Sequence, residues 1–241
     1  LIQVWCLHVF AAEAGQICET KVIDDDQQYI ELFLNIVLLS LYVSVLATIM
    51  SSIISIYVSS MLVINNFTGK NYILLIVNSL MSLPPVVVGL MLYIIFSFSG
   101  VLGFLEILYT PTIMIIAQFI IITPIIISLS YKSLQNRFTE LSEYLKSIHT
   151  PGHKAAYTII KECRYDLLII IMTGLGRALS EVGAVIIVGG NIANMTRVMT
   201  TSIVLETSRG DLALALSLGI TLILLAIIIN VMIYIIKNKY L

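Results

Sequence analysis

Five long runs of apolar residues restrict the fold of this chain more than any other feature. They cover about 32–64, 73–98, 111–131, 167–190 and 212–236. A helix that crosses the roughly 30 Å hydrocarbon layer of a membrane needs about 20 mostly apolar residues, so each run is long enough to span. The runs lack the alternation of barrel strands, and backbone groups in lipid must pair within their own segment. The pattern predicts an all-α integral membrane protein with about five transmembrane helices.

Composition supports lipid as the main solvent of the chain. Apolar residues make up 59% of the sequence and charged residues 11%, whereas a soluble domain carries about 25% charged residues. The net charge of −1 and the lack of a basic arm argue against a nucleic-acid partner. A sixth apolar stretch, 198–205, is too short to cross, and we expect a re-entrant or surface helix there.

The distribution of Lys and Arg predicts the orientation. Lys70, Lys237 and Lys239 fall on one side of a five-span chain. The same side receives the connection between the third and fourth runs, with Lys132, Arg137, Lys146, Lys154, Lys161 and Arg164. The opposite side has only Lys21, Arg197 and Arg209. Because cytoplasmic loops carry the excess of positive charge, we expect the N-terminus outside and the C-terminus in the cytoplasm.

The N-terminal segment 1–28 is predicted to be an external tail of unknown role. Its first twelve residues are apolar without a basic flank, which leaves a signal-like remnant or a partial span as alternatives. Cys6 and Cys18 are able to pair if the tail is external, and free thiols without a role are the simpler interpretation.

Two prolines interrupt the second run at Leu83-Pro84-Pro85. Proline removes a backbone donor and pushes the preceding residue toward extended geometry. Irregular backbone at membrane depth is tolerated where it is buried in protein or lines a cavity. The alternative is a simple kink without substrate contact. Gly89 follows at a spacing suited to close helix contact.

The fourth run carries two charges inside an apolar segment. Arg177 and Glu181 are four residues apart, as are the small residues Gly176, Ser180 and Ala184. Small residues let another helix approach closely. Charges at this depth are expensive, so we expect the two to pair or to face a wet protein-lined cavity, and we interpret them as functional. The alternative is an ion pair that only fixes helix packing.

The cytoplasmic connection, about 132–166, contains an amphipathic pattern. Phe138, Leu141, Leu145 and Ile148 recur at helical spacing, and Pro151-Gly152 then ends the helix. The pattern predicts a short amphipathic helix that either docks a partner protein or packs on lipid headgroups. On the outer side, Arg197 and Arg209 either attract an anion or an acidic partner, or are solvated.

No arrangement of residues indicates catalysis or a metal site. His8, His149 and His153 lack the context of a triad or of metal ligands, and Pro151 lies between the last two. The sequence has no phosphate-binding Walker motif. If ATP drives this protein, another chain must bind it.

Two segments carry a family resemblance. Residues 177–211, RALSEVGAVIIVGGNIANMTRVMTTSIVLETSRGD, and residues 82–93, SLPPVVVGLMLY, resemble the permeases of tungstate ABC importers, relatives of the molybdate permeases. The stretch SEVGA at 180–184 is more similar to the tungstate branch than to the GEFGA of molybdate members. Of the family's cytoplasmic Glu-Ala-Ala-x-x-x-Gly signature, only Glu143 is kept, and His149 stands at the place of the glycine.

The resemblance implies a type I ABC importer permease core over residues 29–241, in the cytoplasmic membrane of a prokaryote. It implies a homodimer with an ATP-binding cassette ATPase beneath, which binds ATP and Mg²⁺, and an external oxyanion-binding protein above. This chain itself then binds no cofactor. The implied ATPase-coupling residues are Glu143, Leu141, Leu145, Ile148 and His149. The implied pathway or gate residues are Pro84, Pro85, Gly89, Arg177, Ser180, Glu181, Gly183 and Asn191, with Arg197 and Arg209 on the outer face.

Other functions compete with this interpretation. A permease for molybdate or another oxyanion has the same features. A stand-alone channel or secondary transporter accounts for the intramembrane charges and the broken second span, but it predicts an inverted repeat that five unequal spans do not offer. An intramembrane enzyme needs convergent polar catalytic residues, and the runs contain none.

Overall fold

The computed structural model describes the backbone of residues 2–65, 67–147 and 152–240, and side chains from Ile30 onward except 143–147, 153 and 240. Its elements are α1 (Ile2–Ile64), α2 (Lys70–Met81), α3 (Pro85–Phe96), the 3₁₀ turn η1 (Gly103–Leu105), α4 (Pro111–Ser147), α5 (Gly152–Glu162), α6 (Arg164–Leu179), α7 (Gly183–Gly189), α8 (Met199–Arg209) and α9 (Leu212–Tyr240). The described part of the chain is helical without strands, as the sequence predicts.

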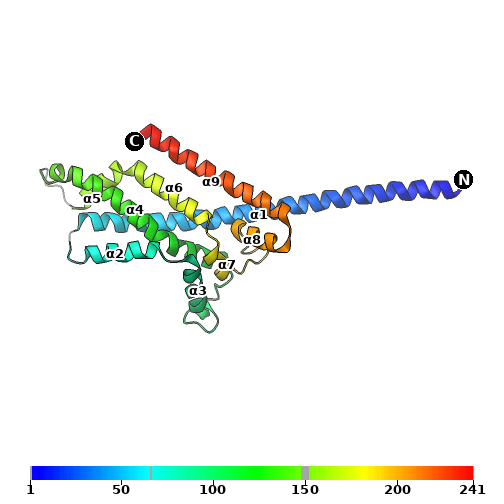
Figure 1. Ribbon diagram of the computed structural model, residues 1–241, viewed down its shortest axis with the longest axis horizontal. Coiled ribbons are helices and arrows are strands. Elements are labelled where there is room, and N and C mark those ends of the chain that lie inside the picture. The colour runs from blue at the N-terminus through cyan, green and yellow to red at the C-terminus, as the bar shows by residue number, and fades with distance from the viewer. Residues whose placement is uncertain (1, 66, 148–151, 241) are drawn as a thin grey trace.

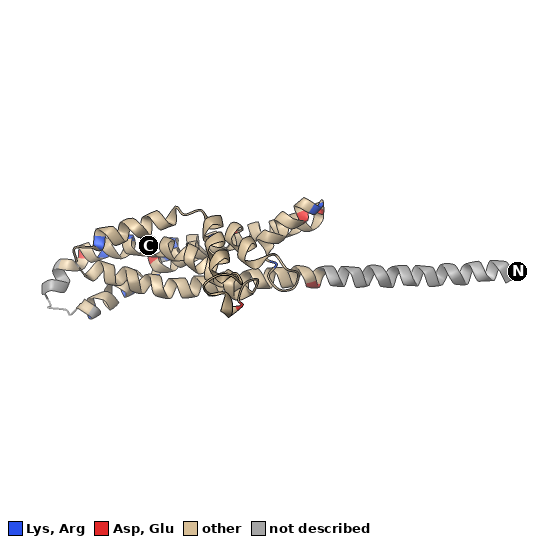
Figure 2. Cartoon of the chain, turned by 90° about the horizontal axis from the view of Figure 1, so that it is seen from below, with Lys and Arg blue, Asp and Glu red and all other residues tan. Residues whose placement is uncertain are grey.

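Three helices are long and apolar enough to cross a membrane by themselves: 30–64 of α1, 111–142 of α4 and 212–239 of α9. Two bent helix pairs, α2 with α3 and α6 with α7, bring the number to five if each pair counts as one span. Figure 2 shows the long helices free of charged residues over most of their length. The chain is therefore a multi-pass membrane protein.

Helices α1 and α4 pack along each other and form the centre of the bundle (Figure 1). Small hydroxyl side chains of α1 allow this close approach. The Ser55 hydroxyl donates to the Thr123 carbonyl (3.3 Å) and the Ser59 hydroxyl to the Ile127 carbonyl (3.0 Å). Both acceptors lie within one helical turn of Pro124, which lacks an N–H and interrupts the hydrogen-bond ladder inside α4. The serines of α1 thus join α1 to α4 around the proline.

The predicted break in the second run is a sharp turn. α2 ends at Met81, α3 begins at Pro85, and the two axes differ by 97°. Pro84 has an extended backbone and Pro85 occupies the first helical turn, where a missing N–H costs no hydrogen bond. The interruption is thus a sharp turn between two helices, and its contact with substrate stays a prediction. The turn directs α3 away from the bundle axis (Figure 1).

The fourth run is also broken, which the sequence analysis did not predict. α6 ends at Leu179, α7 begins at Gly183, and their axes differ by 57°. The prediction that Gly176, Ser180 and Ala184 form one stripe on a single helix is therefore wrong. A Cβ built on Gly176 meets nothing within 4 Å, so no other described helix approaches it closely.

The separate amphipathic helix predicted after Tyr131 is the end of α4. The helix continues without interruption to Ser147, because residues 132–147 contain neither proline nor glycine. Phe138 and Leu141 pack against a buried cluster around Leu134 and Ile159. The amphipathic pattern thus marks the part of α4 that packs on α5.

The short sixth stretch forms α8, of 11 residues. At about 1.5 Å per residue, such a helix is far shorter than the hydrocarbon layer, as expected. α8 packs against α9 and α1, and the backbone N–H of Met199 donates to the Ser40 hydroxyl (2.7 Å).

Candidate translocation site

The two broken spans meet each other through glycines. A Cβ on Gly89 of α3 would lie 2.7 Å from the Ala184 Cα of α7, and a Cβ on Gly183 would lie 2.6 Å from a methyl carbon of Val86. Such distances are far inside van der Waals contact, so each of these positions accepts only glycine without a shift of a neighbour. The predicted close contact at Gly89 is confirmed, and its partner is Ala184.

Glu181 lies in the break between α6 and α7 and is 5% exposed. Its Oε1 accepts a hydrogen bond from the Ala184 N–H (3.2 Å), and its carbonyl accepts one from the Thr200 hydroxyl (2.9 Å). Its Oε2 lies 3.7 Å from the Arg177 guanidinium, whose side chain is 44% exposed. The predicted pairing of the two intramembrane charges is confirmed. The carboxylate also stabilises the start of α7 and so holds the bend.

Ser180 ends α6 on the exposed side of this site. Its hydroxyl donates to the Arg177 carbonyl (3.0 Å), which has lost its helical partner because the helix stops here. The side chain therefore completes the helix end and leaves the space beside Arg177 free of bulk.

Gln118 is a site residue that sequence reasoning missed. It is buried in α4, and its Nε2 donates to the Ala178 carbonyl at the end of α6 (3.1 Å). Its Oε1 has no partner among the described residues. The available signal was one amide inside an otherwise apolar run, since buried polar groups in membrane helices usually mark a hydrogen bond between helices.

Asn191 belongs to the loop that connects α7 to α8. Gly190 and Asn191 both have positive φ (66° and 52°), which reverses the chain after α7. The Asn191 side-chain oxygen accepts a hydrogen bond from the Thr201 hydroxyl (2.9 Å), and the same hydroxyl accepts one from the Val198 N–H (3.1 Å). Asn191 thus fixes the start of α8, and no described contact joins it to Arg177.

The two outer arginines share one buried carboxylate. Glu206 of α8, 6% exposed, lies 3.9 Å from Arg197 and 3.3 Å from Arg209. Arg197 is largely buried, and the solvated interpretation is wrong for it, whereas Arg209 is 57% exposed. Glu206 was missed, although its spacing from Arg209 predicts a helical pair. Glu206 thus pairs with two cations, and Asp211, whose N–H donates to the Glu206 carbonyl (3.0 Å), adds a second carboxylate next to them.

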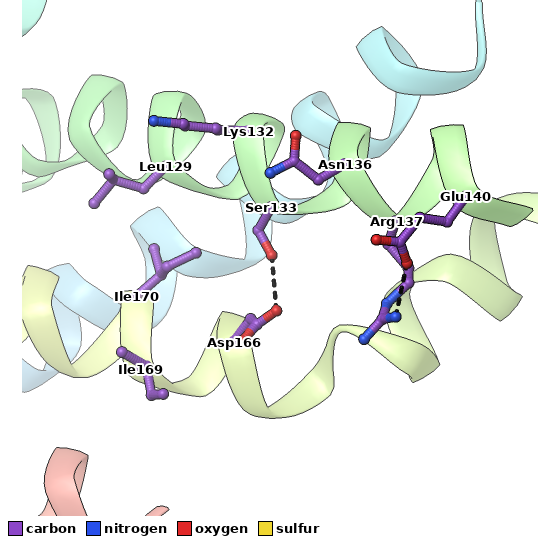
Figure 3. A pocket seen from close by; sticks show the side chains of 9 residues that line it. All are labelled: Leu129, Lys132, Ser133, Asn136, Arg137, Glu140, Asp166, Ile169 and Ile170. Carbon is purple, nitrogen blue, oxygen red and sulfur yellow. Dashed lines mark hydrogen bonds and ion pairs between the residues drawn. The ribbon is translucent and has the colours of Figure 1, made fainter. Parts of the chain in front are cut away.

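A polar groove of about 430 Å³ lies between α4 and α6 near the predicted cytoplasmic end. Figure 3 shows Ser133 and Asp166 pointing toward each other, and the Ser133 hydroxyl donates to the Asp166 carboxylate (3.2 Å). Arg137 and Glu140 form an ion pair at 2.8 Å. The remaining lining residues are Leu129, Lys132, Asn136, Ile169 and Ile170.

Most of the expected coupling residues fall where the structure gives no side-chain description. Leu141 is described and packs against the cluster around Leu134. Glu143 and Leu145 belong to the last turns of α4, but their side chains are not described, and Ile148 and His149 lie outside the described residues.

The fold and this site define a class of protein. Interrupted spans that meet through glycines, with a paired charge in the interruption, are typical of membrane transport proteins, in which broken helices line the substrate path. No family model matches the chain.

Individual relatives establish the family. The chain is 41% identical over 205 residues to the tungstate uptake system permease protein TupB of Peptoclostridium acidaminophilum, with 85% of this chain and 90% of that protein covered. A probable anion ABC transporter permease protein of Haloferax volcanii is 33% identical over 201 residues (81% and 87% covered). TupB of Campylobacter jejuni is 40% identical over 164 residues (68% and 69% covered). This chain belongs to the family of ABC transporter permeases that contains these proteins.

Proposed function

We propose that this chain is the membrane permease subunit of an ATP-driven oxyanion importer and that tungstate is its substrate. The observation that supports tungstate as the substrate is the 41% identity, over most of the chain, to a permease named for tungstate uptake. The two guanidinium groups of Arg197 and Arg209 at the outer cluster agree with an anion as the transported species.

The proposed path runs from the outer cluster toward the break between α6 and α7. α8 connects the two places, since it carries Glu206 at one end and Thr200, which bonds to the Glu181 carbonyl, at the other. An external binding protein would deliver the anion above α8. Pro84, Pro85 and Gly89 shape α3 against Ala184, and we assign this crossing to the gate.

Energy would enter through a separate ATPase subunit that binds ATP and Mg²⁺. The proposed docking segment is 132–166, which contains the end of α4 and the whole of α5, and α5 lies outside the candidate spans. The Ser133–Asp166 bond joins α4 to α6 at this end. A displacement of α4 by the ATPase would therefore be transmitted to α6, which carries Arg177. Two copies of the chain would enclose the path between them in the prokaryotic cell membrane.

ATP-dependent uptake into vesicles tests this function. The vesicles contain this chain with its ATPase and are supplied with the binding protein and with tungstate, molybdate or sulfate. We expect tungstate uptake that requires all three proteins. Preferred uptake of molybdate or sulfate would reassign the substrate, and uptake by this chain alone without ATP would indicate a channel or secondary transporter.

A further inference from the structure

We infer that Arg177 contacts the oxyanion directly inside the membrane, and that Glu181 holds the guanidinium only while the path is empty. The inference rests on the proposed function, because it requires an oxyanion to pass α6. In this step of transport, Arg177 leaves the Glu181 carboxylate to bind the passing anion and returns to Glu181 when the anion has moved on.

The two charges are anchored unequally. Glu181 is buried and keeps the hydrogen bond from the Ala184 N–H whether or not Arg177 is present. The Arg177 guanidinium makes no hydrogen bond to any described residue, and its nearest carboxylate oxygen is 3.7 Å away, which is too long for a hydrogen bond. A guanidinium has five N–H donors, so this side chain retains its full donor capacity at membrane depth.

The space around Arg177 suits a compact anion. Gly176 offers no side chain, and a Cβ built there meets nothing within 4 Å. The Ser180 hydroxyl is already bonded to the Arg177 carbonyl and adds no bulk. The exposed 44% of the Arg177 side chain therefore borders an open face of α6. The planar guanidinium presents its N–H donors in pairs, and this geometry matches the oxygens of a tetrahedral oxyanion.

Electrostatics favours the exchange and keeps it reversible. Coulomb attraction scales with the product of the charges, so a dianion at the same distance attracts the guanidinium twice as strongly as Glu181 does. Repulsion between the dianion and the Glu181 carboxylate offsets part of this attraction and favours release of the anion. Glu181 remains nearby and recovers Arg177 when the anion moves on. A contact that binds and releases easily is what a conduction path requires.

The competing interpretation is that the pair only stabilises the bend between α6 and α7. The two interpretations differ in what happens when both charges are removed together. If the pair is structural, Arg177→Gln/Glu181→Gln should restore whatever Arg177→Gln loses, because no uncompensated buried charge remains. If Arg177 contacts the anion, the double variant should assemble but should lose most of its transport.

The experiment measures tungstate uptake in the vesicle system described above for Arg177→Gln, Arg177→Lys and the double variant. Lys237→Gln is the control, because it removes one exposed cation at the end of α9. We expect Arg177→Gln and the double variant to lower maximal uptake by about tenfold or more. The concentration of loaded binding protein at half-maximal uptake should stay unchanged, and the control should transport normally.

Wild-type uptake by the double variant would overturn the inference. If the double variant does not assemble, Arg177→Lys decides: it keeps the charge and the attraction to Glu181 but loses the paired donors, and normal uptake by it would also overturn the inference. Absence of tungstate uptake by the wild-type chain would instead refute the proposed function, so the two failures are distinguishable.

Discussion

At the scale of single residues, glycine decides which helices come close together. Gly89 and Gly176 both lie in helices, yet only Gly89 has a neighbour where a Cβ would stand. The spacing of small residues in the sequence pointed to both positions. The structure separates them, because proximity to Ala184 depends on the 97° turn before α3 and not on the sequence around either glycine.

We predict that Gly89→Ala destabilises the protein and that Gly176→Ala does not. A methyl group at position 89 would overlap the backbone of Ala184, and overpacking of this kind costs about 1–3 kcal/mol. At position 176 the methyl enters open space and favours the helix by up to about 1 kcal/mol. Thermal unfolding of the purified variants in detergent should show a lower midpoint for Gly89→Ala alone. An equal decrease in both variants would contradict the close contact.

Cys163 offers a second test at the residue scale. The thiol lies outside the candidate spans, at the junction of α5 and α6, and is 2% exposed. Burial is the largest cause of a raised pKa for this thiol, and a hydrogen bond with the Ser133 side chain opposes it. A raised pKa leaves less thiolate at neutral pH, and the thiolate is the reactive form.

We therefore expect slow alkylation of Cys163 in the folded protein, with a rate that still increases above the ordinary thiol pKa. The measurement is maleimide labelling between pH 7 and about 10 in a Cys6→Ser/Cys18→Ser background. The unfolded protein is the control and should react fast and reach its plateau earlier. Rapid labelling of the folded protein at pH 7 would show that the α5–α6 junction is open.

At the scale of elements, irregular connections are held by side-chain hydrogen bonds. The loop between α7 and α8 is fixed by Thr201, whose hydroxyl bonds to both Asn191 and Val198. The same principle applies to Gln118 of α4, which donates to the Ala178 carbonyl at the end of α6. Backbone groups freed at a helix break need such partners, because lipid supplies none.

We predict that Thr201→Val lowers stability by about 1–3 kcal/mol, because it leaves buried polar groups at Asn191 and Val198 without their partner. Thr201→Ser is the matched control and should lose little, because it retains the hydroxyl. Thermal unfolding of the two variants tests this. If both unfolded at the wild-type temperature, the hydroxyl would not be what holds α8.

At the scale of the whole molecule, the orientation in the membrane remains a prediction from the Lys and Arg distribution. We expect Ser208→Cys, in the exposed end of α8, to react with an impermeant maleimide added to intact cells. Asn238→Cys, near the end of α9, should react only after permeabilisation. Both changes are made in a chain without native cysteines. The reverse pattern would mean that the N-terminus faces the cytoplasm.

Assembly with the ATPase is the second prediction at this scale. Leu145→Asp should prevent copurification of the ATPase subunit, because it places a charge on the apolar side of the proposed coupling helix. Asn238→Asp adds the same charge at the other end of the chain and serves as the control. Normal copurification with Leu145→Asp would contradict the proposal that residues 132–147 dock the ATPase.

The sequence alone determined the membrane class, the helical content and the approximate positions of the apolar runs. The length and polarity of such runs are local properties, and they decide whether a segment is stable in lipid. It also identified Pro84 and the Arg177–Glu181 pair, since prolines and buried charges are costly wherever they occur. Only the tertiary structure revealed the break between α6 and α7, the continuation of α4 to Ser147 and the burial of Glu206. The break and the burial of Glu206 depend on which helices lie side by side, and such contacts join residues that are far apart in the chain. The continuation of α4 is compatible with the local sequence, because residues 132–147 contain neither proline nor glycine.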